Sequence, residues 1–205
     1  MTIRKNTEIR KKQITDAVRE IIARYGSENI TIRRLSRAVG ISEAAIYRHF
    51  KSKREILSFL VEDIEQTWMT EIEQSEIATH PALSAIDIVL RNRISTAEQR
   101  GGVSFQVIAE IISLGDKKLN KQAAAVVDRY IGALADLVAS GIHDGEIKED
   151  INPVAIATII FGMIQGLVNN WALNNYNFNL IVRYTPMWNM LHAAMQKTPE
   201  LALRR

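Results

Sequence analysis

Apolar residues recur every three to four positions along nearly the whole chain, which is the spacing of helices with one buried face. The first stripe ends before Gly26, a helix stop signal, and comprises Ile14, Ala17, Val18, Ile21, Ile22 and Tyr25. No stretch alternates convincingly between apolar and polar residues with a period of two, as a half-buried strand does. The pattern therefore predicts an all-α fold of about nine helices.

Two short helices are predicted on either side of a tight turn at Gly40. Thr31 is a suitable N-cap for the first helix, and Ser42 is one for the second, which continues to His49. Gly40 can adopt the positive φ angle that the turn needs. Two short helices around such a turn are typical of a helix-turn-helix, in which the second helix enters the major groove of DNA. We therefore expect a DNA-reading element between Thr31 and Phe50.

Longer helices are predicted for the rest of the chain. Ser52 and Glu55 form a capping-box pattern that opens the next helix. The remaining predicted helices run from about 81 to 99, 103 to 114, 117 to 141, 153 to 173 and 180 to 196. Pro186 either kinks the last helix or marks its true start. The helix over 153–173 is apolar on more than one face, so it must be buried on several sides.

Charge is distributed unevenly along the chain. Residues 1–60 hold 14 Lys and Arg against 6 Asp and Glu, whereas residues 61–205 hold 12 against 17. A basic N-terminal third on an acidic remainder suggests a module that binds a polyanion such as nucleic acid. A solvated basic face would give the same distribution, so charge alone leaves both interpretations open.

Composition excludes several other classes of protein. The chain has no cysteine, so it can form neither a disulfide framework nor a thiolate metal site. Its charged start is no secretory signal, and the apolar run over 154–168 is interrupted and too short to span a bilayer. We therefore expect a soluble cytoplasmic protein that does not enter a membrane. We find no pattern for a catalytic site, a metal site or a cofactor, and expect the chain not to be an enzyme.

The outward side chains of the second short helix are the candidates for DNA contacts. Glu43, Ala44, Tyr47 and Arg48 point outward, with Ser42 and His49 at the two ends. Arg33 lies in the first turn of the preceding helix and could also reach a base. An arginine can bind guanine through two hydrogen bonds, worth about 1–3 kcal/mol of discrimination. Glu43 could accept a hydrogen bond from cytosine, or could simply be favoured by the helix dipole.

Residues 31–53 resemble the DNA-binding domain of TetR/AcrR-family regulators. In that family the fragment Tyr-x-His-Phe-x-x-Lys ends the recognition helix and opens the next helix, and here it is Tyr47, His49, Phe50 and Lys53. The resemblance covers about residues 10–60. It implies a DNA-binding domain over 1–52 and a ligand-binding and dimerisation domain over 53–205. The contacts that it implies are to phosphates from Thr31, Tyr47, His49 and Lys53, and to bases from Arg33, Glu43, Ala44 and Arg48.

The resemblance also implies a small-molecule pocket in the C-terminal domain. Large or polar residues on mostly apolar helices are the candidates for its lining, although residues of this kind are more often ordinary core or surface. They are Trp68, Arg91, Phe105, Gln106, Tyr130, Phe161 and Gln165. The many apolar residues suggest a hydrophobic or amphipathic ligand, and Arg91 could meet an acidic group.

The last two predicted helices are candidates for a dimer interface. Gly162 and Gly166 are spaced for close helix packing, and two helices from each chain would form a four-helix contact. A twofold dimer would present two recognition helices to a pseudo-palindromic operator in double-stranded DNA. The sequence thus predicts a homodimeric repressor that an unknown small-molecule effector releases from DNA. The alternative is a DNA-binding protein whose C-terminal domain engages a protein partner.

Overall fold

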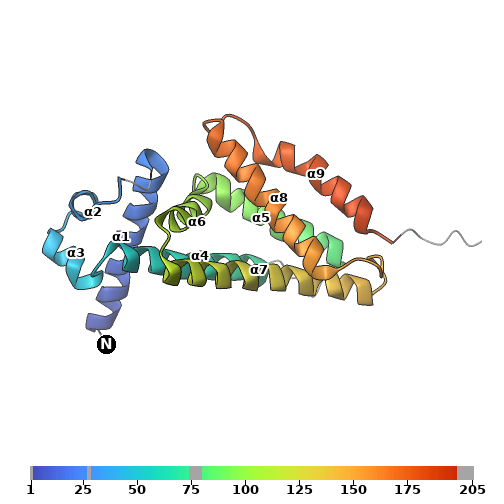
Figure 1. Cartoon of the computed structure of the whole chain (residues 1–205), viewed down its shortest axis with the longest axis horizontal. Helices are drawn as coiled ribbons and strands as arrows, with labels where there is room; N and C mark the ends of the chain where they lie inside the picture. Colours follow the sequence, from blue (N-terminus) through green and yellow to red (C-terminus); the bar gives the residue numbers. More distant parts are fainter. Residues whose placement is uncertain (1, 27–28, 74–79, 198–205) are drawn as a thin grey trace, which may run out of the picture. The chain divides into compact units, whose positions relative to one another are not determined.

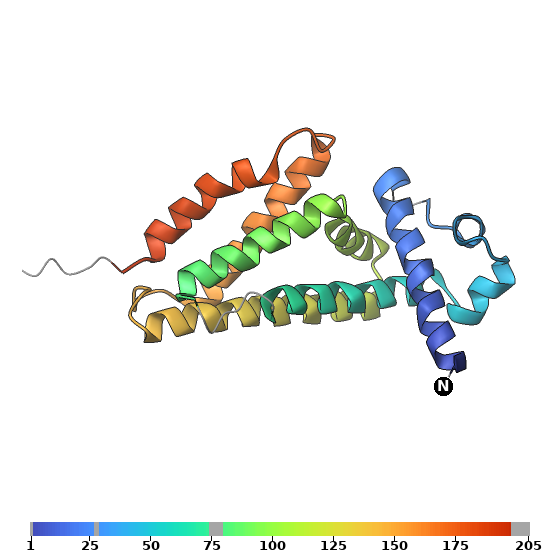
Figure 2. The same cartoon turned by 180° about the vertical axis from the view of Figure 1, so that it is seen from behind.

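Nine helices and no strand occur in the part of the chain that the computed structural model describes, residues 2–26, 29–73 and 80–197. The predicted all-α fold is therefore confirmed (Figures 1 and 2). The helices are α1 (Thr2–Tyr25), α2 (Ile32–Val39), α3 (Glu43–His49), α4 (Lys53–Glu73), α5 (Ala82–Gln99), α6 (Val103–Leu114), α7 (Lys117–His143), α8 (Pro153–Leu173) and α9 (Leu180–Met195).

Local capping explains where the short helices begin. The hydroxyl of Thr31 accepts a hydrogen bond from the Arg34 backbone N–H at 3.1 Å, and the hydroxyl of Ser42 accepts one from Ala45 at 3.1 Å. Gly40 ends α2 with a φ of 70°, a conformation that glycine adopts without steric cost. The predicted turn is therefore formed by the residues that the sequence indicated.

The capping box of α4 differs in one detail from the expected pattern. Ser52 accepts a hydrogen bond from the Glu55 N–H at 3.2 Å, as expected. The Glu55 carboxylate reaches the N–H of Lys51 at 2.7 Å, one residue before the position that a capping box predicts. The helix nevertheless begins at Lys53, directly after its cap.

The described contacts group the chain into two units. The first comprises residues 1–67 and 97–127, and the second comprises 68–96 and 128–205. In the first unit α1, α2 and α3 pack on one another (Figure 1) and bury Ile14, Leu35 and Ile46 completely. The boundary between the units falls inside α4, α5 and α7, so the proposed functional division after residue 52 stays a prediction.

In the second unit α8 and α9 lie side by side and antiparallel (Figure 1). Pro186 lies inside α9, which begins at Leu180, so the proline does not mark the helix start. Gly141 of α7 allows a close approach, because a Cβ atom there would lie 2.7 Å from Ala82 Cβ and 2.7 Å from Ile147 Cδ1. These contacts join α5, α7 and the following turn.

Helix α8 has 21 residues and is long and apolar enough, by length and composition, to cross a membrane. The run over 154–168, which was expected to be too short to span a bilayer, is part of this longer helix. The core helix of a soluble protein passes the same test. Ile156, Ile160 and Ile164 of α8 are buried within the second unit, as in such a core helix.

Candidate nucleic-acid interface and effector site

Helix α3 exposes the side chains that the sequence predicted to face DNA. Ile46 is completely buried, whereas Tyr47 on the outward side is 51% exposed. Glu43, Ala44 and Arg48 are exposed as well. The recognition helix therefore has one face in the core and one face open to a ligand as large as DNA.

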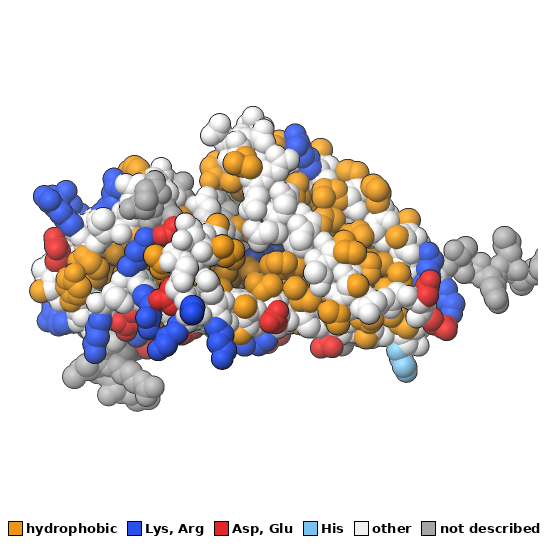
Figure 3. All heavy atoms as spheres, viewed as in Figure 1, with side chains coloured by type: hydrophobic (Ala, Val, Ile, Leu, Met, Phe, Trp, Pro, Cys, Tyr) orange, Lys and Arg blue, Asp and Glu red, His pale blue; other side chains and the backbone are white. Residues whose placement is uncertain are grey.

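The remaining predicted DNA contacts lie where the neighbouring helices begin. Thr31 and Arg33 at the start of α2 are exposed, as is Ser42 before α3. The oxygens of Thr31 and Ser42 accept the capping hydrogen bonds, which leaves the hydrogen of each hydroxyl available for a phosphate. Figure 3 shows Lys and Arg side chains gathered over α1–α3.

His49 is half-buried at the end of α3 and is held in its neutral form. Its Nδ1 atom is buried and has no hydrogen-bond partner in the described part of the chain. Burial lowers the pKa of His49 most, and the positive charges of Arg10, Arg48 and Lys11 lower it further. The neutral ring can still donate one N–H, so His49 is suited to a phosphate contact without carrying a charge in the free protein.

An arginine-lined groove of about 780 Å³ lies between α1 and α2. Arg33, one of the predicted base contacts, lines it together with Arg24, Arg34 and Arg37. The Arg34 guanidinium lies 4.4 Å from the centre of the Tyr25 ring. The groove places additional positive charge beside the start of α2, where a DNA backbone would be attracted.

Three polar links fasten the start of α4 to α6, to α7 and to the turn between them within the first unit. Lys53 Nζ lies 2.7 Å from Glu110 Oε1, and Arg54 lies 3.4 Å from Asp116. Ser58 donates a hydrogen bond to Gln122 at 2.7 Å and receives one on its backbone oxygen at 3.1 Å. The helix that opens at a predicted phosphate contact is thus bound to two later helices.

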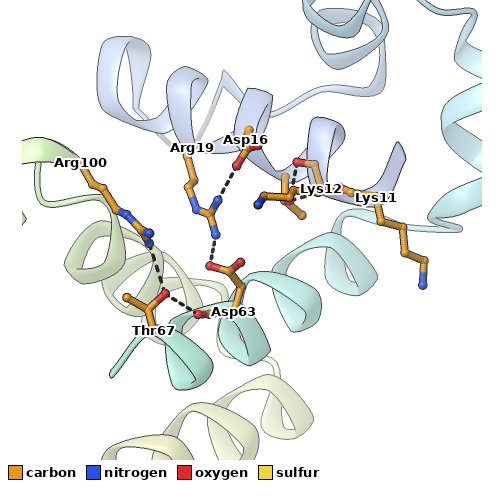
Figure 4. A network of polar contacts seen from close by, with 8 residues as sticks. Lys11, Lys12, Asp16, Arg19, Asp63, Thr67 and Arg100 are labelled. Atoms are coloured by element: carbon orange, nitrogen blue, oxygen red, sulfur yellow. Dashed lines mark hydrogen bonds and ion pairs between the residues drawn. The ribbon is translucent and has the colours of Figure 1, made fainter. Parts of the chain in front are cut away.

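A second network joins α1 to α4 (Figure 4). Arg19 of α1 bonds Asp16 at 2.6 Å and also bonds Asp63 of α4. Thr67 donates to the backbone oxygen of Asp63 at 2.9 Å and accepts from Arg100 at 3.3 Å. These contacts tie α4 to α1, on which α2 and α3 pack.

Three predicted ligand residues meet in the interior of the second unit. The ring centres of Trp68 and Tyr130 are 5.2 Å apart, and Phe161 lies 6.1 Å from Trp68 and 6.3 Å from Tyr130. The Arg93 guanidinium lies 4.1 Å from the centre of the Trp68 ring, and its Nη1 lies 3.6 Å from Glu71. We call these five residues, from α4, α5, α7 and α8, the buried polar cluster.

Sequence reasoning missed Arg93 and Glu71, although both are buried. Each stands seven positions after a buried isoleucine on its own helix, Arg93 after Ile86 and Glu71 after Ile64. Seven residues make about two helical turns, so this spacing placed both charged residues on the apolar face. That spacing was the available signal for a buried ion pair.

Among the uncharged side chains of the buried polar cluster, two hydrogen-bonding atoms lack a partner in the described residues. They are the Tyr130 hydroxyl and the Trp68 Nε1–H. An unsatisfied buried polar group costs about 1–3 kcal/mol. Burial raises the pKa of Tyr130 to about 12, so its hydroxyl keeps its proton.

The other predicted ligand residues do not join this cluster. Arg91 pairs with Asp87 at 3.0 Å and its side chain is 41% exposed. Gln165 bonds Asn169 on α8 at 3.1 Å, and Phe105 and Gln106 belong to α6 in the first unit. Only the three aromatic residues therefore share one site within the second unit.

The N-terminal part and the C-terminal part of the chain each match a known protein family. Residues 14–58 match the family described as bacterial regulatory proteins, tetR family. Residues 54–194, more than half of the chain, match the YsiA-like protein C-terminal region. The chain belongs to the TetR family. The resemblance inferred from the helix-turn-helix is thus confirmed.

Several TetR-family relatives are similar over most of their length. The fatty acid metabolism regulator protein of Bacillus subtilis is 24% identical over 82% of this chain and 87% of its own. The nucleoid occlusion factor SlmA of Vibrio cholerae is 23% identical over 91% of this chain and 96% of its own. The crystal structure of FadR from B. subtilis in complex with stearoyl-CoA has the same fold, with a TM-score of 0.79 at 23% identity over 89% of this chain and 97% of that one.

As a TetR-family protein, the chain is a DNA-binding transcription regulator and not an enzyme. Regulators of this family bind DNA and small molecules, and they dimerise. The exposed face of α3 and the charged start of α2 are the surfaces on which DNA binding is to be sought.

Proposed function

We propose that this protein is a cytoplasmic homodimeric repressor that leaves a pseudo-palindromic operator when a long-chain acyl thioester binds its C-terminal domain. The observation that carries the DNA-binding part is the exposed outer face of α3. Arg33 and Arg48 would read bases there together with Glu43 and Ala44. Thr31, Ser42, Tyr47, His49 and Lys53 would hold phosphates.

The names of its relatives support the choice of effector. One relative is a fatty acid metabolism regulator, and FadR of B. subtilis was crystallised with stearoyl-CoA. The buried residues of the second unit are mostly apolar and aromatic, which suits contact with an acyl chain. An effector releases DNA only if it binds the DNA-incompetent state more tightly than the competent one.

The homodimer would form through α8 and α9. Exposed apolar side chains occur on both helices, among them Ile159 at 52% and Met190 at 76% exposure. Figure 3 shows hydrophobic side chains gathered over these helices. Among the described residues, a Cβ atom at Gly162 or Gly166 would meet nothing within 4 Å, so neither glycine is required by a close contact there. They would allow a second copy to approach closely.

Electrophoretic mobility of DNA from upstream of the protein's own gene tests the proposal. We expect a shifted complex with the wild-type protein at moderate salt, and its loss on addition of stearoyl-CoA. Tyr47→Ala combined with Arg48→Ala should abolish the shift without affecting the fold, because both side chains are exposed. Failure to bind any palindromic site would contradict the proposal.

A second candidate function replaces the small ligand by a protein partner. The similarity to the nucleoid occlusion factors SlmA supports it, because that similarity extends over 91% of this chain. In this case stearoyl-CoA would leave the DNA complex unchanged, and the DNA-bound protein would capture a partner through its C-terminal domain. The mobility experiment thus separates the two candidates.

A further inference from the structure

The charges of the buried polar cluster cancel one another. Arg93 is 3% exposed and Glu71 is 8% exposed, and they lie 3.6 Å apart. Burying a further charge beside this neutral pair would be costly without a new counter-charge. The cluster therefore favours an uncharged group over a free carboxylate.

The cluster also offers two donors that need an acceptor. The Trp68 Nε1–H can only donate, and the protonated Tyr130 hydroxyl can donate. Trp68 is 1% exposed and Tyr130 is 2% exposed, so bulk water does not reach either residue. The centres of their rings lie 5.2 Å apart, so the two side chains are neighbours in the same cluster.

A second buried tyrosine in the same unit differs from Tyr130, because its hydroxyl has a hydrogen-bond partner. Tyr184 of α9 is completely buried, and its hydroxyl donates a hydrogen bond to Asp87 of α5 at 2.7 Å. Its ring also stacks on Trp188. The hydroxyl of Tyr184 therefore has a structural role that the hydroxyl of Tyr130 lacks.

We infer that Tyr130 and Trp68 hold the carbonyl oxygen of an uncharged acyl group, with Tyr130 as the principal donor. This inference rests on the proposed acyl-thioester effector and names the residues that recognise its carbonyl. The neutral Arg93–Glu71 pair disfavours a free fatty acid, so the site distinguishes esters and thioesters from acids. Phe161 and the rings themselves pack against the apolar part of the ligand.

The test compares two ligands that differ only at the carbonyl. Stearoyl-CoA carries the thioester carbonyl, and S-octadecyl-CoA replaces it by a methylene. Calorimetric titration of the full chain below the micelle-forming concentrations should give at least tenfold tighter binding of stearoyl-CoA. Tyr130→Phe should lose most of this preference, since only the Trp68 Nε1–H then remains to donate to the carbonyl, and should bind S-octadecyl-CoA as the wild type does.

The unfolding temperature shows whether the Tyr130 hydroxyl serves to recognise the ligand or to stabilise the fold. Ligand-free Tyr130→Phe should unfold at or above the wild-type temperature, because it removes a hydroxyl that has no partner. The matched control Tyr184→Phe should unfold at a lower temperature and keep the preference for the thioester.

Each other result contradicts the inference in a distinct way. Equal binding of the two ligands by the wild type overturns it while leaving the proposed effector intact. An undiminished preference in Tyr130→Phe overturns the role of Tyr130, and a lowered unfolding temperature shows that the hydroxyl is already bonded. Binding of neither ligand overturns the acyl-thioester effector and this inference together.

Discussion

Lys53 Nζ of α4 lies 2.7 Å from Glu110 Oε1 of α6, so a residue predicted to hold a DNA phosphate is engaged by an acidic side chain of a later helix. A phosphate and Glu110 would compete for the same ammonium group. Any shift of α6 that strengthens the ion pair would weaken the DNA contact. If Lys53 holds a DNA phosphate, this pair would couple the position of α6 to DNA binding.

Glu110→Gln should strengthen operator binding about two- to fivefold, because a partly exposed ion pair is worth up to about 1 kcal/mol. The salt dependence of binding should steepen by up to about one counterion, since Lys53 becomes available to a phosphate. Fluorescence anisotropy at several salt concentrations measures both quantities.

Asp116→Asn is the matched control for Glu110→Gln. It removes the charge beside Arg54, which is not a predicted DNA contact, and its oxygen can still accept from the N–H groups of Lys118 and Leu119. Operator affinity should then be unchanged. An equal gain in both variants would point to net charge and not to Lys53.

Arg48 and Tyr47 should have different effects on sequence preference. Arg48→Ala should reduce discrimination at one base pair by about 1–3 kcal/mol, since a guanidinium can read guanine. Tyr47→Phe removes only a predicted phosphate contact, so it should weaken binding to all sequences alike. Selection from a pool of randomised operators measures the preference, and equal loss of preference in both variants would contradict these roles.

The pKa of His49 predicts how operator binding depends on pH. A phosphate beside His49 would raise the pKa that burial and neighbouring cations lower in the free protein. The complex would then take up a proton, so affinity should rise as the pH falls from 8 to 6, by at most tenfold per pH unit. His49→Gln should show a smaller rise at constant ionic strength; an identical rise would exclude His49 as its source.

The same pKa shift acts on stability in the opposite direction. Since the folded pKa lies below the unfolded value of 6.5, the unfolded chain binds the proton more readily. The contribution of neutral His49 to stability is complete above pH 6.5. It is lost as the pH falls from there through the lower pKa of the folded chain. In the absence of DNA, His49→Gln should therefore lose less stability than the wild type between pH 7 and pH 5, as measured by urea denaturation.

The helix ends could be predicted from the sequence because they depend on a few neighbouring residues. Thr31 and Ser42 cap α2 and α3, and Gly40 supplies the positive φ angle between them. The exposed face of α3 was predictable for the same reason, since Ile46 and Tyr47 fall on opposite sides of one short helix.

The buried polar cluster depends on contacts between distant parts of the chain. The sequence offered Arg91 as the arginine of a ligand site, but the structure buries Arg93 and pairs exposed Arg91 with Asp87. The two arginines are two residues apart on α5, which places them on nearly opposite sides of the helix. Packing between the helices decides which side of α5 faces Glu71 and Trp68. It also decides that Lys53 pairs with Glu110.

Two glycines of α7 should respond to alanine with opposite signs. In Gly141→Ala the new Cβ would lie 2.7 Å from Ala82 Cβ and Ile147 Cδ1, so we expect a loss of about 1–3 kcal/mol of stability. In Gly132→Ala nothing lies within 4 Å, so the better helix propensity of alanine should add about 0.5–1 kcal/mol. Chemical denaturation measures both changes, and destabilisation by Gly132→Ala would contradict the helix geometry.

A charge placed on the exposed apolar face of α8 and α9 should disrupt the proposed dimer. Met190 is 76% exposed, so Met190→Glu should not disturb the core of a single chain. In a twofold dimer through these helices, the new carboxylate would be buried near its symmetry mate, which is strongly unfavourable. Light scattering should therefore find a monomer, and affinity for a two-half-site operator should fall at least a hundredfold.

Ile112→Glu is the matched control for this charge. Ile112 lies on α6, outside the proposed dimer face, and is 68% exposed. It should leave both the dimer and operator binding unchanged. A dimer that persists in Met190→Glu would exclude α8 and α9 as the interface. A monomer with undiminished operator affinity would instead show that one recognition helix suffices, since a single half-site could then account for all of the binding.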